Sequence, residues 1–82
     1  MTPFSMYDEV RVVKVLSKAA MERFPQDQRP PQPGDTATIL EIYTRPPGYE
    51  LECCDDQGMT IWLGGYGPDD LELERIWQAP PE

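Results

Sequence analysis

The chain has 82 residues and contains no histidine, which removes several classes of chemistry at once. Ser-His-Asp and Cys-His catalytic arrangements cannot be assembled without an imidazole. The mixed Cys and His ligand sets of zinc sites are excluded for the same reason. Cys53 and Cys54 are adjacent, whereas zinc knuckles and thioredoxin-type redox pairs need a spaced C-x-x-C motif. We therefore expect no catalytic residue, no metal and no cofactor.

The chain also has no long apolar run. No stretch approaches the roughly 20 residues of a transmembrane helix, and the first residues, MTPFSM, lack the basic start and apolar core of a signal peptide. We expect Cys53 to be buried and Cys54 to be more exposed, both as free thiols, which suits a reducing compartment. These features predict a cytoplasmic protein with no membrane association.

Basic residues are scarce and their distribution is uneven. Seven Lys and Arg stand against fifteen Asp and Glu, for a net charge of −8. Residues 1–45 hold six of each sign, so the whole excess lies in residues 46–82, where Arg75 is the single base. Phosphate backbones and anionic lipids repel such a chain. The acidic half either keeps a small protein soluble or steers a partner protein that has a basic surface.

Alternating apolar residues predict about five short β-strands. Tyr49–Cys53 is the clearest, with Leu51 and Cys53 on one face and Glu50 and Glu52 on the other. Asp55-Asp56-Gln57-Gly58 is typical of a hairpin turn in which Gly58 takes a positive φ. The EF-hand spacing of a calcium loop is missing there. The expected strands are Tyr7–Val15, Asp35–Thr44, Tyr49–Cys53, Met59–Leu63 and Leu71–Glu74.

Two of the expected strands, Tyr7–Val15 and Asp35–Thr44, break strict alternation. A phase slip at Val12-Val13 indicates a β-bulge or a strand that leaves the sheet, and apolar side chains on both faces of Asp35–Thr44 indicate a strongly curved central strand or another bulge. On the strand after the hairpin, alternation assigns Met59, Ile61 and Leu63 to the buried face and Thr60 and Trp62 to the outer face. A break at Gly64-Gly65-Tyr66-Gly67 and a closing role for Ile76 and Trp77 complete this prediction.

The segments between the strands carry helix and loop signals. Leu16, Ala20 and Phe24 recur at helical spacing after the potential N-cap Ser17, and Pro25 ends the pattern. Residues 25–34 are proline-rich, which favours an extended surface loop; their PxxP pattern also permits a ligand for a proline-binding domain. Residues 68–70 are typical of one 3₁₀ turn, and residues 78–82 form a flexible tail.

These elements predict one mainly all-β domain over residues 1–82, a small SH3-like five-stranded barrel with its strands within 7–77 and one short helix in the first long loop. The segments YDEVRVVKV, PGDTATILEIY, YELECCDDQGMTI and GPDDLELE resemble domain-of-unknown-function family 4926. The resemblance covers most of residues 7–74, with Ala37 in place of the usual Gly and a longer first loop. It implies an SH3-like barrel and no reaction, and it makes a bacterial antitoxin-like or immunity-like binder plausible.

The predicted partner-binding surface is the outer side of the third and fourth strands with its flanking turns. A solvent-facing Trp62 among carboxylates would form a binding patch with one aromatic anchor. The alternative is that Trp62 packs beneath the Leu16–Phe24 helix. The predicted binding residues are Glu50, Glu52, Asp55, Asp56, Trp62, Asp69 and Asp70.

Three classes of function compete at this point. The first is a small acidic module that docks a basic partner protein, as an antitoxin, immunity protein or inhibitor would, and it includes nucleic-acid mimicry. The second is an accessory subunit of a larger enzyme or complex. The third is a nucleic-acid or ribosome-associated SH3-like domain, whose basic face would come from Arg11, Lys14, Lys18, Arg23 and Arg29. The oligomeric state has no signal in the sequence.

Overall fold

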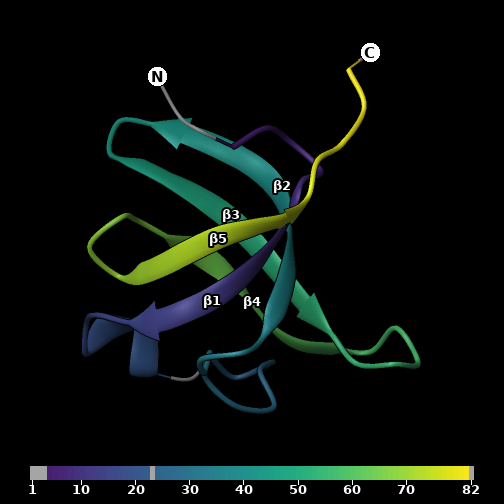
Figure 1. Cartoon of the computed structure of the whole chain (residues 1–82). Coiled ribbons are helices and arrows are strands. Elements are labelled where there is room, and N and C mark those ends of the chain that lie inside the picture. The colour runs from purple at the N-terminus through teal and green to yellow at the C-terminus, as the bar shows by residue number, and fades with distance from the viewer. Residues whose placement is uncertain (1–3, 23, 82) are drawn as a thin grey trace.

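The computed structural model describes residues 4–22 and 24–81 and contains one five-stranded antiparallel sheet. The strand order is β4-β3-β2-β1-β5, so β1 lies between β2 and β5 (Figure 1). The mainly β fold is therefore confirmed. No helix in these two ranges is long and apolar enough to cross a bilayer. The elements are β1 (Glu9–Val15), the 3₁₀ helix η1 (Ala19–Met21), β2 (Thr36–Thr44), β3 (Pro47–Cys54), β4 (Thr60–Tyr66) and β5 (Leu71–Trp77).

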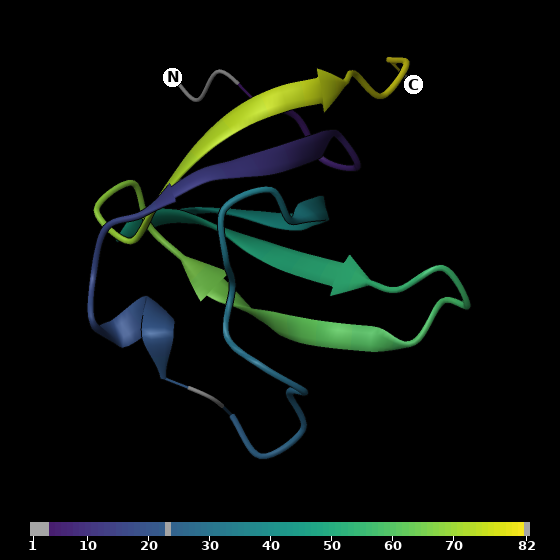
Figure 2. The same ribbon diagram turned by 60° about the horizontal axis from the view of Figure 1, so that its bottom comes forward.

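A single hydrophobic core lies against one face of this curled sheet. The strands fan out from β5 to β4 around it (Figure 2). Its fully buried side chains come from β1, β2, β3 and β4. In β1 and β3 they are the residues that strict alternation assigns to the inner face. Phe4, Tyr49 and Leu73 pack at its margin. The fully buried core side chains are Val10, Val12, Ile39, Leu51 and Trp62.

The sheet does not close into a barrel, which corrects the predicted architecture. β4 and β5 are its two ends. The edge of β4 is taken by the first loop, because the Gln28 amide donates to the Ile61 carbonyl at 2.8 Å and the Leu63 amide donates to Asp27 Oδ1 at 3.2 Å. At the other end Ile76 and Trp77 are exposed, so their predicted closing role is wrong.

β-Bulges decide which face each side chain takes. The register shifts between Val12 and Lys14 in β1, as predicted from the phase slip there. A shift within β2, between Ile39 and Glu41, is confirmed as well. These extra residues bend the strands and increase their twist, which curls the five strands around the core.

Two further register shifts were not predicted. One lies opposite Glu9 and Val10, where Ile76 of β5 is the extra residue, and the other inverts the face assignment of β4. Cys53 is the register partner of Trp62, whereas the next residue, Cys54, is the partner of Thr60. Ile61 is the extra residue, so Trp62 points inward beside buried Cys53 and Leu63 lies on the outer face. Trp62 is fully buried and Met59 is exposed. The prediction of a solvent-facing Trp62 is therefore wrong, and β4 also continues through Tyr66 rather than breaking at the glycines.

The first loop contains less helix than its periodicity predicts. Only η1 forms, and of the three periodic residues Ala20 is buried while Leu16 and Phe24 are exposed. The Ser17 hydroxyl oxygen accepts the Ala20 amide at 3.1 Å, but the N-cap residue of η1 is Lys18, one residue after the predicted one. Ala20 belongs to the same buried cluster as Trp62, so Trp62 is buried as the alternative requires, although η1 replaces the Leu16–Phe24 helix that was expected to cover it.

Asp35 fixes the proline-rich part of this loop onto the core. Its carboxylate accepts two bonds from the Arg29 guanidinium at 2.8 and 2.9 Å and one from the Trp62 indole at 2.9 Å. Burial raises the pKa of Asp35, but the bonds from Arg29, the Gln32 amide and Trp62 outweigh it and lower the pKa overall. Pro31 is fully buried as a result of this anchoring.

Asp8 joins the two ends of the chain. Its fully buried carboxylate accepts bonds from the Ser5 amide, the Arg75 guanidinium and the Ala79 amide at 2.8 to 2.9 Å. Residues 78–81 are therefore attached through Ala79, whereas the sequence predicts a flexible tail. The preceding residue, Tyr7, has a positive φ of 70° and an exposed ring.

Candidate functional site: a ring-lined groove between two turns

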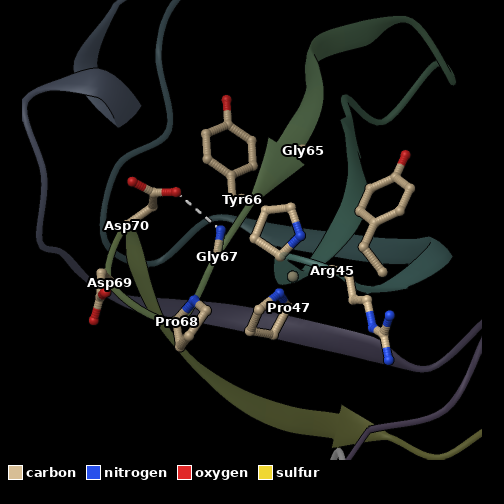
Figure 3. A pocket seen from close by; sticks show the side chains of 11 residues that line it. Arg45, Pro47, Gly65, Tyr66, Gly67, Pro68, Asp69 and Asp70 are labelled. Carbon is tan, nitrogen blue, oxygen red and sulfur yellow. Dashed lines mark hydrogen bonds between the residues drawn. The ribbon is translucent and has the colours of Figure 1, made fainter.

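A groove of about 600 Å³, lined by aromatic and proline rings, lies between the β2–β3 turn and the β4–β5 turn. The first turn includes the cis peptide bond between Arg45 and Pro46. Figure 3 shows Pro47 beside Pro68, with Arg45 on one side of them and Asp69 on the other. The groove is lined by Tyr43, Arg45, Pro46, Pro47, Gly48, Gly65, Tyr66, Gly67, Pro68, Asp69 and Asp70.

Two glycines allow the walls and floor of the groove to approach closely. A Cβ atom on Gly48 would lie 2.8 Å from the carbonyl oxygen of Tyr66, a distance that backbone cannot accommodate without moving. A Cβ atom on Gly65 would lie 3.4 Å from Glu50 Oε1 and 3.6 Å from Tyr43 Cε2. Gly65 therefore leaves open the space between the Tyr43 ring and the Glu50 carboxylate.

The β4–β5 turn is held by the side chain of Asp70. Its Oδ2 accepts the Gly67 amide at 2.9 Å, and its Oδ1 accepts the Ser17 hydroxyl at 2.7 Å. The bonds from Ser17 and Gly67 stabilise the ionised carboxylate of Asp70. They outweigh the opposite effect of burial, so the pKa of Asp70 is lowered. The segment forms a hydrogen-bonded turn rather than the predicted 3₁₀ helix. Asp70 is thus ionised and fixed, and it attaches η1 to the groove.

Tyr43 supplies the exposed aromatic wall. Its ring is 42% exposed, and its hydroxyl donates to Glu50 Oε1 at 2.9 Å. This bond to a carboxylate raises the pKa of Tyr43. The bond also orients the ring, so an aromatic face and a carboxylate stand side by side at the edge of the groove.

Tyr66 forms the inner wall and joins the groove to the core. Its ring meets Trp62 edge to face at a centroid distance of 5.6 Å. The Tyr66 hydroxyl is buried and has no hydrogen-bond partner among residues 4–22 and 24–81. Burial first, and then the charge of Asp27, raise the pKa of Tyr66 to about 12.

The predicted binding residues lie in two separate groups on the surface, except for one residue that is not on the surface. Asp69 and Asp70 line the groove, and Glu50 borders it through Tyr43 and Gly65. The second group, Glu52, Asp55 and Asp56, lies toward the β3–β4 hairpin tip, at the opposite end of that hairpin (Figure 1). Trp62 lies in the core and cannot serve as the surface anchor.

The carboxylates at the hairpin tip are occupied mainly in holding the turn. Asp55 Oδ1 accepts the amides of Gln57 and Met59, each at 2.9 Å. Gly58 has φ of 82°, which confirms the predicted turn chemistry. Glu52 accepts the Thr60 hydroxyl at 2.7 Å. Asp56 is exposed at the tip.

The thiols beside the tip are not activated. Burial raises the pKa of Cys53 to about 11. Burial and the charge of Glu52 raise the pKa of exposed Cys54, as predicted from its acidic neighbours. Thiols with raised pKa values are poor nucleophiles near neutral pH. In the described part of the chain no cluster of three or more Cys, Asp or Glu could hold a metal ion.

Ion pairing leaves the acidic half uncompensated. Within residues 4–22 and 24–81 the ion pairs are Arg11–Glu74, Arg29–Asp35 and Arg75–Asp8. Glu74 is the only acid of residues 46–82 in these pairs. Two members of the predicted basic face, Arg11 and Arg29, are engaged, and a third, Arg23, lies outside the described residues. The carboxylates at the groove and at the hairpin tip are outside these pairs, and the basic residue that lines the groove is Arg45.

Nothing in the sequence marks the groove's ring-bearing residues, Tyr43, Pro46, Pro47 and Pro68, as members of one site. Two proline-containing turns, at 45–48 and 67–70, were visible as separate connections. Their proximity depends on the register in which Tyr49 is the partner of Tyr66. Sequence spacing alone does not show that register.

Comparison of the chain with protein-family models, curated proteins and solved structures finds no match. The resemblance to domain-of-unknown-function family 4926 stays a prediction.

Proposed function

We propose that this chain is a small acidic protein-binding module that captures a basic segment of a partner protein in the groove between the two turns. One observation carries this proposal. Exposed rings, of which Tyr43 is the largest, lie beside Asp69 and Glu50, and neither carboxylate is in an ion pair within residues 4–22 and 24–81. Apolar rings supply contact area, while uncompensated carboxylates select and orient a positively charged partner.

The division of the carboxylates into two groups favours one mode of partner binding over another. Imitation of a nucleic acid would need a continuous track of carboxylates, whereas Asp55 and Asp70 are bound within their own turns. Capture of one protein segment, as by an inhibitor, antitoxin or immunity protein, is the version that this arrangement favours. We place it in the cytoplasm, because both cysteines are free thiols.

Two matched charge reversals test the proposal. Asp69 and Asp56 are both exposed carboxylates in turns, and neither makes a hydrogen bond or ion pair with the described residues. Asp69→Lys places a cation in the groove, and Asp56→Lys makes the same change at the hairpin tip. We expect Asp69→Lys to reduce partner capture from the protein's own cells by about 10-fold or more, equivalent to about 1.4 kcal/mol, and Asp56→Lys to change it less than about twofold.

The capture is quantified by mass spectrometry at two salt concentrations, since binding that depends on charge weakens as salt rises. Equal loss in both variants would assign binding to overall negative charge rather than to the groove. A selective loss with Asp56→Lys would move the site to the hairpin tip and overturn the proposal.

A further inference from the structure

Resting on the proposed function, we propose that the segment bound in the groove is an extended, proline-containing peptide in the polyproline II conformation, with an arginine or lysine placed against Asp69. The inference concerns the chemical class of the ligand at this same site. It follows from the shape of the surface around Pro68, from the hydrogen bonds that the groove backbone has already used, and from the positions of its charges.

The surface around Pro68 is divided into shallow hollows with ring walls. A second hollow, of about 350 Å³, adjoins the groove and contains Ile42 and Tyr49, and a third, of about 200 Å³, contains Phe4 and Tyr49. Pro68 lines all three. Tyr49 and Phe4 meet edge to face at 5.5 Å. An extended ligand with several proline rings along its length can place one ring in each hollow. A ligand with a single large anchor side chain would fill only one of them.

The backbone of the groove offers few sites for strand addition. β3, which supplies Pro47 and Gly48, has β2 on one side and β4 on the other. The Gly67 amide is occupied by Asp70, and the prolines have no amide hydrogen to donate. A polyproline II segment needs no such partners, because its backbone groups stay in contact with water. Recognition of this kind uses aromatic-lined grooves and a preformed ligand.

Both sides of the contact are preorganised. Pro46, Pro47 and Pro68 have φ fixed by their rings, Asp70 holds the β4–β5 turn, and Glu50 orients Tyr43. A polyproline II ligand loses little conformational entropy on binding. This matters for a small surface, since rigid partners need fewer contacts for a given affinity.

The charges give the ligand a direction. Asp69 and Arg45 lie on opposite sides of the groove (Figure 3). A basic residue of the ligand is attracted toward Asp69 and repelled from Arg45. The basic end of the peptide therefore lies at the β4–β5 turn, and a proline at the far end lies against Tyr43.

A peptide series tests this inference on the full chain by NMR titration of backbone amides. The reference peptide has ten residues, two prolines separated by two residues, and one flanking arginine. A second peptide has both prolines replaced by alanine, and a third has the arginine replaced by glutamate. We expect the reference peptide to shift amides of residues 43–50 and 65–70, and each altered peptide to bind about 10-fold more weakly.

Protein variants locate the contact. Tyr43→Ala removes the exposed ring of the groove, and Trp77→Ala removes a similarly exposed aromatic ring on β5. Tyr43→Ala should weaken the reference peptide by about 10-fold and Trp77→Ala by less than about twofold. Unchanged amide spectra outside the substituted region show that each variant is folded.

Two results would overturn the inference, and they have different meanings. Binding of the alanine peptide within about twofold of the reference would leave a basic-segment site intact but reject the proline ligand. Absence of groove shifts with all three peptides would reject the ligand class, while the capture experiment with Asp69→Lys decides the proposed function independently.

Discussion

Replacement of Trp62 by alanine is expected to destabilise the protein by about 3–5 kcal/mol, the usual cost of truncating a large buried aromatic residue. Trp62 is fully buried, packs edge to face on Tyr66 and donates its indole hydrogen to Asp35 at 2.9 Å. A domain of this length has about 4–12 kcal/mol of stability, so Trp62→Ala removes much of it. Urea unfolding followed by far-ultraviolet circular dichroism measures the change.

Trp62→Phe and Trp77→Ala are the controls for this prediction. Phenylalanine keeps an aromatic ring in the core and loses the bond to Asp35, so its cost is about 1–2 kcal/mol. Trp77 is half-exposed on β5, so its removal should change stability by less than about 1 kcal/mol. A Trp62→Ala variant as stable as Trp77→Ala would restore the surface position that alternation assigns to Trp62.

The second large effect is expected at Asp8. Asp8→Asn removes the charge and one acceptor oxygen from a buried group that receives three hydrogen bonds. Such a loss costs about 3 kcal/mol. The matched control is Glu74→Gln, which breaks the exposed pair with Arg11 and should cost less than about 1 kcal/mol. Thermal unfolding of the two variants and the parent at neutral pH measures the difference.

The Asp8 contribution should depend on pH in one direction. Burial raises the pKa of Asp8, but the bonds from Ser5, Ala79 and Arg75 outweigh burial and lower the pKa below 3.8. The carboxylate therefore stabilises the fold at pH values above 3.8, and this stability is lost as the pH falls through the folded-state pKa. The stability difference between the parent and Asp8→Asn should be constant near neutral pH and narrow below 3.8. A difference that widens on acidification would contradict this assignment.

The strand content of the fold could be predicted from sequence because it depends on local alternation. Val10 and Val12, and Leu51 and Cys53, share a buried face as their spacing requires. Gly58 takes the positive φ that the Asp-Asp-Gln-Gly turn predicts. Bulges in β1 and β2 were visible because an apolar residue there breaks the alternation.

The errors arose where a long-range contact overrides the local pattern. The β4 bulge at Ile61 is set by pairing with β3, so alternation from Met59 placed Trp62 on the wrong face. The helical spacing of Leu16, Ala20 and Phe24 was outweighed by the loop's attachments to Asp35 and to the β4 edge. Those same attachments to β4 explain why the sheet stays open.

The charged residues of the candidate site could be predicted from the sequence, but its ring-bearing residues could not. Negative charge in the second half is a property of composition, so Asp69, Asp70 and Glu50 could be named. Of their neighbours in the groove, Tyr43 and Arg45 belong to the neutral half of the chain, and the uncharged Pro46 and Pro47 begin the acidic half. Only the β2–β3–β4 register places the two turns beside one another.

Photo-crosslinking in the protein's own cells tests the central claim most directly, because it reports which surface a partner contacts. Benzoylphenylalanine is introduced in place of Arg45, an exposed lining residue of the groove, and separately in place of Met59, which is 62% exposed beside the hairpin tip. We expect a discrete crosslinked partner from position 45 that disappears when Asp69→Lys is added, and none from position 59. A partner crosslinked from position 59 alone would contradict the central claim.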